Sequence, residues 1–207
     1  MNRTAFAALA VAAALLVPAA GRAHDHHAMM DMQMMPMGKP MAGASVYNLP
    51  ETWTDQDGKP LKLQDLRGRP VVLAMAYTAC KEMCPMTVET MRRIEDKWAQ
   101  RSQAPVTFAF FSFDTARDTP QHLKDYAAAH GLDAAHWRLL NGDEAAVRDL
   151  AAVLGVAYRR EANGDFNHAY AISVLDADGV VAEQQTGLNT DVDAVLAKLA
   201  QLTPAKP

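Results

Sequence analysis

The sequence of 207 residues predicts a mixed α/β domain, in which helices pack on both faces of a β-sheet. Two apolar runs, within residues 69–78 and 106–114, are typical of strands that are buried on both faces. Apolar residues at helical spacing follow the first run, and helix start and stop signals follow the second. Two further strand-like segments lie on either side of Asp178-Gly179, which are turn residues of a hairpin.

Residues 1–23 have the features of a secretory signal peptide. Arg3 precedes an apolar run at 5–17, and small residues stand at Gly21 and Ala23. We expect cleavage after Ala23 and export to the periplasm. The apolar run is shorter than the roughly 20 residues that a membrane-spanning helix needs, so retention of this segment as a membrane anchor is the weaker alternative.

Residues 24–44 are predicted to form a disordered tail. The stretch HDHHAMMDMQMMPMGKPM contains three of the seven histidines and seven of the twelve methionines, but no β-branched or aromatic residue. Such a composition cannot build a packed core. The folded domain is therefore expected to span residues 45–203, a length that suits a single globular core.

The charge balance argues against two classes of partner. The chain has 24 acidic and 20 basic residues, and its lysines and arginines form no cluster. Nucleic acids and anionic membrane surfaces are both bound through clustered positive charge. We therefore expect neither as a partner.

The other elements follow in chain order. The domain opens with short extended segments around a turn at Asp57-Gly58. Proline in the first turn and glycine at the end set most of the helix limits. Helices are predicted from Pro85 to about Arg101, within 118–131, within 143–155 and from about Thr190 to Leu202, and further strands at 136–142, 169–175 and 180–185. This order predicts a thioredoxin-like domain of the glutaredoxin or peroxiredoxin type.

The two cysteines of the chain, Cys80 and Cys84, lie in the stretch YTACKEMCP. Because the ring of Pro85 would clash with the carbonyl of Lys81 in a helix, Cys80 falls in the preceding loop and Cys84 at the N-terminal edge of the helix. The unpaired N–H groups and the helix dipole there favour a thiolate. We therefore expect a reactive pair. A structural disulfide is the alternative, but its short loop would add little stability.

Two chemistries compete for this pair. Dithiol oxidoreductases of the thioredoxin class have two residues between the cysteines and a proline facing them, whereas this chain has three residues there and no proline between Pro120 and Pro204. His168 stands just ahead of the hairpin, which in this fold faces the N-terminus of the first helix. We predict that Cys80, Cys84 and His168 form a metal site.

Copper suits these three ligands, because thiolates are soft donors for Cu(I) and imidazole helps to hold Cu(II). Zinc would accept the same ligands together with a water molecule. Export and the methionine-rich tail favour copper. The alternative for His168 is a partly exposed loop histidine that is hydrogen-bonded to nearby backbone.

Three stretches carry a resemblance to a known family: YTACKEMCP, FFSFDTARDTP and FNHAYAISVLDADG. In this order they resemble the Sco/SenC family of copper-binding, thioredoxin-fold assembly factors for cytochrome oxidase, over roughly residues 45–202. The resemblance implies that Cys80, Cys84 and His168 are the copper ligands. It also implies delivery of copper to, or reduction of, the CuA-bearing subunit of cytochrome c oxidase or another cuproprotein client, with a periplasmic thiol reductant as a further partner. The main alternative is a thiol-disulfide oxidoreductase that carries no metal, and a copper or redox sensor is a third.

Asp114 is a secondary candidate, because it matches the family's acidic loop after the second central strand. There it could tune the site or contact a partner. The alternative is structural: Arg117 pairs with an acid, and Asp118 or Thr119 caps the next helix.

The tail offers a second possible metal site. Thioethers bind Cu(I) without losing a proton, and the candidate ligands are Met32, Met34, Met35 and Met37. Cleavage after Ala23 would also leave a chain that begins His24-Asp25-His26, whose amine, backbone amides and third-position imidazole form a square-planar set for Cu(II) or Ni(II). The alternative is a flexible spacer.

Overall fold

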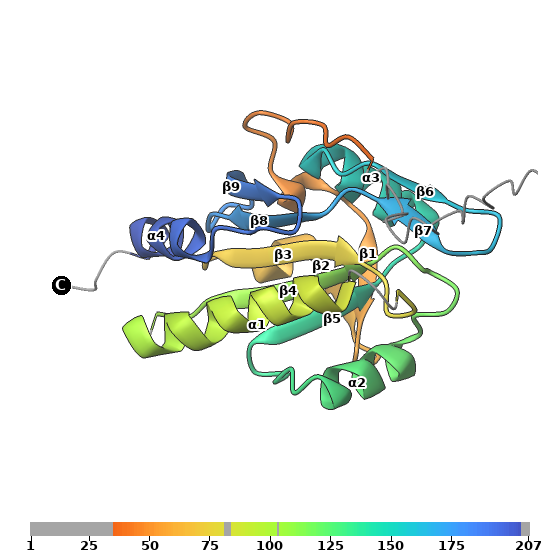
Figure 1. The fold of residues 1–207 in the computed structure, drawn as a ribbon, viewed down its shortest axis with the longest axis horizontal. Coiled ribbons are helices and arrows are strands. Elements are labelled where there is room, and N and C mark those ends of the chain that lie inside the picture. The colour runs from red at the N-terminus through yellow and green to blue at the C-terminus, as the bar shows by residue number, and fades with distance from the viewer. Residues whose placement is uncertain (1–34, 81–83, 103, 204–207) are drawn as a thin grey trace, which may run out of the picture. The chain divides into compact units, whose positions relative to one another are not determined.

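The computed structural model describes residues 35–80, 84–102 and 104–203. These residues form a seven-stranded mixed sheet in the order β2-β1-β5-β4-β3-β8-β9 (Figure 1). Its strands are β1 (Thr52–Asp55), β2 (Pro60–Lys62), β3 (Val71–Ala76), β4 (Thr107–Ser112), β5 (Trp137–Asn141), β8 (Ala171–Leu175) and β9 (Val181–Thr186). The two apolar runs of the sequence are β3 and β4, at the centre of the sheet, as predicted.

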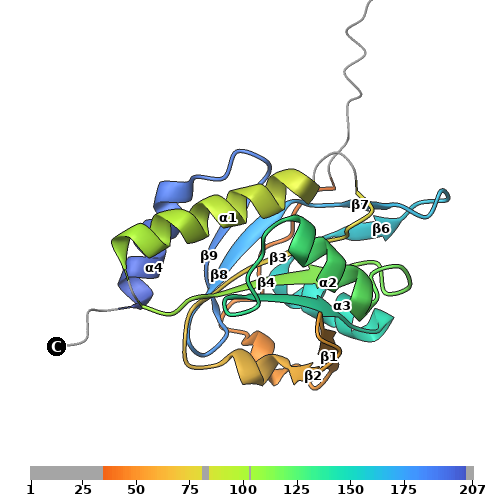
Figure 2. The same ribbon diagram turned by 90° about the horizontal axis from the view of Figure 1, so that it is seen from below.

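Helices cover both faces of this sheet (Figures 1 and 2). They are α1 (Cys84–Arg101), α2 (Pro120–Ala129), α3 (Glu144–Leu154) and α4 (Val192–Leu202), with two short 3-10 helices, η1 (Val46–Asn48) and η2 (Leu63–Leu66). Because β3, β4 and β5 are parallel neighbours, the right-handed crossovers through α1 and α2 lie on one face. Helix α4 packs beside α1, and α3 covers the opposite face. The predicted thioredoxin-like fold is confirmed.

The apolar pattern of the sequence explains the core. All six residues of β3 are buried, since helices cover it on both sides. Helix α1 buries Val88, Met91, Ile94 and Trp98, which recur at helical spacing along one face. Among the described residues, no helix is long and apolar enough to cross a bilayer.

A second, two-stranded sheet lies outside the seven-stranded one. Its strands are β6 (Tyr158–Arg160) and β7 (Phe166–His168), which pair in antiparallel register. The sequence analysis placed His168 in a loop and missed this hairpin. Its signal is Asn163-Gly164, a dipeptide typical of hairpin turns, and Gly164 has a φ of 86°.

The described part of the segment predicted as a tail, 35–44, lies against the end of α3. The amide of Gly38 donates a hydrogen bond of 2.8 Å to the carbonyl of Gly155, and the amide of Met41 one of 2.9 Å to that of Val153. A Cβ atom on Gly155 would come within 2.7 Å of the carbonyl carbon of Lys39. This stretch is therefore packed on the domain by backbone contacts that need glycine at the helix end.

Candidate metal centre

The structure brings together two of the three predicted ligands from distant parts of the chain. Cys84 is the first residue of α1, and His168 is the last residue of β7. The Sγ atom of Cys84 lies 3.6 Å from Nε2 of His168, and both side chains are buried, with exposures of 1% and 2%. In Figure 2 the N-terminal end of α1 accordingly lies beside β7.

The imidazole of His168 is oriented as a ligand would be. Its Nδ1 donates a hydrogen bond of 3.1 Å to the carbonyl of Ala169, which leaves the lone pair of Nε2 facing Cys84. Metal-binding histidines are commonly held in this way, with the second ring nitrogen bonded to a carbonyl. Burial lowers the pKa of His168 below its usual value, so the ring is held in the neutral form that binds metals. The alternative of a partly exposed loop histidine is wrong in its exposure and its loop position, since His168 is buried at the end of β7, but the hydrogen bond to nearby backbone that it expected is present.

The acidity expected of Cys84 is also wrong. The neighbouring Cys80 and the burial of the sulfur both raise the pKa of the Cys84 thiol above its ordinary value. The helix N-terminus does favour a thiolate, but the hydrogen bond with Cys80, and after it the loss of contact with water, oppose it more strongly. Cys84 is therefore a protonated thiol here, and metal binding would require its proton to leave.

Cys80 lies in the loop that follows β3 and is partly buried. Its Sγ accepts a hydrogen bond of 3.4 Å from the amide of Cys84, and the two cysteines are not joined by a disulfide. Within the described ranges, no three His, Cys, Asp or Glu side chains already stand close enough together to hold a metal ion. The donor chemistry of the three side chains suits copper, but Cys80 would have to move closer to Cys84 and His168.

Aromatic rings enclose the Cys84–His168 pair. The His168 ring lies 4.5 Å from that of Tyr170 and 4.9 Å from that of Phe113, between ring centroids. Tyr77, just before the cysteine loop, has its pKa raised to about 12, chiefly by burial. These rings restrict the access of water to the imidazole and hold it in one orientation.

Arg117 ties the hairpin that carries His168 to the rest of the domain. Its Nη2 donates a hydrogen bond of 2.7 Å to the carbonyl of Gly164 at the hairpin turn, and its Nε donates to the carboxylate of Asp114. Asp114 is only 2% exposed and pairs with Arg117, as the structural alternative expected, while its tuning of the site remains a prediction. It acts through Arg117 and presents no surface to a partner.

Asp118 is a residue that the sequence analysis considered only as a helix cap, a role that Thr119 fills instead. The fully buried carboxylate of Asp118 accepts hydrogen bonds from the amide of Thr78, at 3.1 Å, and from the hydroxyls of Thr78 and Ser112. Because Thr78 stands two residues before Cys80, Asp118 fixes the start of the cysteine loop. No sequence signal links two residues that are forty positions apart.

The structure says little about the second metal site. His24, His26, Met32 and Met34 lie outside the described residues. Met35 and Met37 are partly buried, and Met37 packs against the core. The thioether proposal therefore remains a prediction.

Comparison with known proteins identifies a family whose relatives include a protein named for copper binding. A family model described as SCO1/SenC matches residues 41–204. A protein from Stutzerimonas stutzeri that is named for copper binding is 30% identical over 129 residues, which are 60% of this chain and 62% of that protein. The match thus spans less than two thirds of that relative.

Solved structures show the same fold. A SCO1/SenC family lipoprotein from Bacillus anthracis is 26% identical, with a TM-score of 0.69 over 81% of this chain and 99% of that one. BsSco, described as a member of the Sco family of cytochrome c oxidase assembly proteins with a disulfide switch, is 22% identical, with a TM-score of 0.67 over 80% and 98%. Since the family model spans the whole described domain from residue 41 onward, this chain belongs to the SCO1/SenC family.

Proposed function

We propose that this protein is an exported copper chaperone that binds the ion through Cys80, Cys84 and His168. In this proposal it delivers copper to the CuA centre of cytochrome c oxidase, or prepares that centre by reducing its cysteines. The observation that carries the proposal is the approach of the Cys84 sulfur to within 3.6 Å of the His168 imidazole, across 84 residues of chain.

Each ligand has a distinct part in this proposal. The thiols of Cys80 and Cys84 supply soft donors that retain Cu(I), and the neutral imidazole of His168 adds the nitrogen that Cu(II) prefers. Three protein ligands leave a position open for a ligand from the client, which suits transfer rather than storage. The relatives named for copper binding and for oxidase assembly support this assignment.

The site must be reduced before it can bind the ion, because only separate thiols can become two thiolate ligands. A periplasmic thiol reductant is therefore part of the proposal. The N-terminal segment 1–23 supports export, and the three-residue spacing between the cysteines permits either two free ligands or a disulfide.

The test compares His168→Ala with His136→Ala in the reduced protein. His136 is an exposed histidine on the loop before β5, so it serves as the matched control. Titration with Cu(II), followed by electron paramagnetic resonance, should show affinity at least about 100-fold lower for His168→Ala, because even outer-shell partners are worth roughly 10- to 100-fold. The control should bind like the wild type. Equal affinity in all three proteins would remove the copper assignment.

A thiol-disulfide reductase without metal is the second candidate. The contact between the Cys84 amide and the Cys80 sulfur favours it, because it keeps the two cysteines within reach of each other. Under this reading His168→Ala would retain the rate of disulfide exchange with a client peptide, and the wild type would not metallate a CuA domain. The chaperone reading requires copper transfer by the wild type and its loss in His168→Ala.

A further inference from the structure

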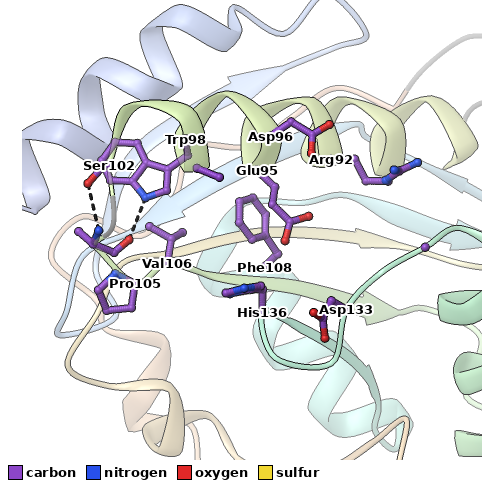
Figure 3. Close-up of a pocket in the computed structure, with 13 residues that line it drawn as sticks. Arg92, Glu95, Asp96, Trp98, Ser102, Pro105, Val106, Phe108, Asp133 and His136 are labelled. Carbon is purple, nitrogen blue, oxygen red and sulfur yellow. Dashed lines mark hydrogen bonds between the residues drawn. The ribbon is translucent and has the colours of Figure 1, made fainter.

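A cavity of about 490 Å³ lies at the far end of α1 from Cys84 (Figure 3). It opens between the C-terminal half of α1, the start of β4 and the loop that leads into β5. Its volume is in the range of small-molecule sites, and none of the predicted metal ligands lines it. The lining residues used below are Arg92, Glu95, Asp96, Trp98, Phe108, Asp133 and His136.

One side of the cavity is apolar. Phe108 is 2% exposed and stacks on Trp137, with ring centroids 5.2 Å apart. Trp98 contributes its ring but no free donor, since its Nε1 donates to the carbonyl of Ala104 at 2.9 Å. Val106 and Pro105 complete this side, which would receive the apolar body of a ligand.

Beside this apolar surface lies a carboxylate that is held in a fixed position. The indole Nε1 of Trp137 donates a hydrogen bond of 2.7 Å to Oε2 of Glu95, and in Figure 3 the side chain of Glu95 projects from α1 towards His136 and Asp133. Burial raises the pKa of Glu95 above its ordinary value. The protein therefore keeps a carboxylate where its charge is poorly solvated.

The charges around the cavity are unequal. Glu95, Asp96 and Asp133 bring three carboxylates, against the guanidinium of Arg92 and the imidazole of His136. Arg92 is partly engaged outside the cavity, where it pairs with Glu89 at 3.7 Å. A metal ion is not the expected occupant, because no three ligating side chains of the described residues are placed to hold one.

We propose that this cavity binds a small organic cation, an amidinium, guanidinium or ammonium group on an apolar body. The apolar body packs on Phe108, and the positive group pairs with the Glu95 carboxylate. A cation there adds to the partial counter-charge that His136 and Arg92 give Glu95, and the hydrogen bond from Trp137 holds the carboxylate in place for it. The site is distinct from the Cys80, Cys84 and His168 group and does not depend on copper binding.

The test uses three probes of nearly equal shape: benzamidinium, neutral benzamide and anionic benzoate. Each is titrated into the ¹⁵N-labelled full chain, and the indole N–H signal of Trp137 reports directly on Glu95. Benzamidinium should shift this signal and the amides around the cavity with saturation. The other two probes should bind at least about fivefold more weakly.

Glu95→Gln keeps the shape and the acceptor for Trp137 but removes the charge, so it should weaken benzamidinium binding by about tenfold or more. Glu144→Gln is the control, since Glu144 is exposed at the start of α3 and does not line the cavity. The proposal is overturned if benzoate or benzamide binds as tightly as benzamidinium, if the two variants behave alike, or if no saturable shift reaches Trp137.

Discussion

The guanidinium of Arg117 donates a hydrogen bond of 2.7 Å to the backbone carbonyl of Gly164, at the tip of the hairpin that carries His168. The same guanidinium bonds the buried carboxylate of Asp114, directly after β4. Arg117 therefore links the end of β4 to the turn of the hairpin that carries His168.

Arg117→Ala should lower the affinity for Cu(II) by about 10-fold, because a hydrogen bond to a charged group contributes roughly 1.5–3 kcal/mol. The reduction potential of the cysteine pair should change little, since both sulfurs lie on other elements. Arg159→Ala is the control. Arg159 lies on the same hairpin and pairs with nearby Glu161, at 2.9 Å. If Arg159→Ala weakened Cu(II) binding as much as Arg117→Ala did, the hydrogen bond between Arg117 and Gly164 would have no special role.

Asp118→Ala should destabilise the fold by about 3 kcal/mol. The substitution leaves the Thr78 amide and the hydroxyls of Thr78 and Ser112 without their buried acceptor, and each unsatisfied group costs roughly 1–3 kcal/mol. Urea denaturation of the reduced protein measures the change. Asp125→Ala, on the exposed side of α2, should cost less than about 0.5 kcal/mol. Similar losses in both variants would contradict this account.

Glu95 should make stability depend on pH. Because its pKa is raised in the folded protein, the folded state holds this proton more tightly than the unfolded chain does. The associated stabilisation is complete below the ordinary pKa of 4.5 and is lost as pH rises through the higher folded value.

Glu95→Gln carries no such proton, so its melting temperature should exceed that of the wild type at pH 7 by more than at pH 4. Thermal denaturation followed by circular dichroism at both pH values tests this. If the melting temperature of Glu95→Gln exceeded that of the wild type by more at pH 4 than at pH 7, folding would favour the ionised form of Glu95, which would contradict this account.

Gly155→Ala should cost more stability than Gly58→Ala, although both glycines have positive φ, 69° and 77°. Alanine in this conformation costs about 1 kcal/mol in either place. At Gly155 the new Cβ would also collide with the backbone of Lys39, whereas at Gly58 nothing lies within 4 Å. Chemical denaturation should show an excess cost of at least about 1 kcal/mol for Gly155→Ala. Equal costs would mean that the contact with segment 35–44 contributes nothing.

Much of the fold could be predicted because its signals are local. The apolar runs of β3 and β4, the proline at the start of α2 and the glycine after α3 each act within a few residues. The approach of Cys84 to His168 was also predictable, because strand order in a thioredoxin-like sheet brings the hairpin strand β8 beside β3.

Other features depend on contacts that a sequence does not display. The hairpin β6–β7 is short and largely polar, so it lacks the alternation typical of a strand. The raised pKa of the Cys84 thiol depends on how deeply the helix start is buried. The bonds between Asp118 and Thr78 join positions whose proximity is created only by the assembled sheet.

In the part of the chain that the structure describes, the hairpin β6–β7 shares no backbone ladder with the seven-stranded sheet. One half of the candidate copper site therefore lies at the start of α1, and the other half belongs to a hairpin that side chains attach to the domain, through Arg117 and the ring of Phe113. Under the proposed function, an acceptor protein that bound the hairpin β6–β7 would move the imidazole of His168 away from Cys84. The bound ion would then be open to ligands of the acceptor, while the seven-stranded sheet kept its structure.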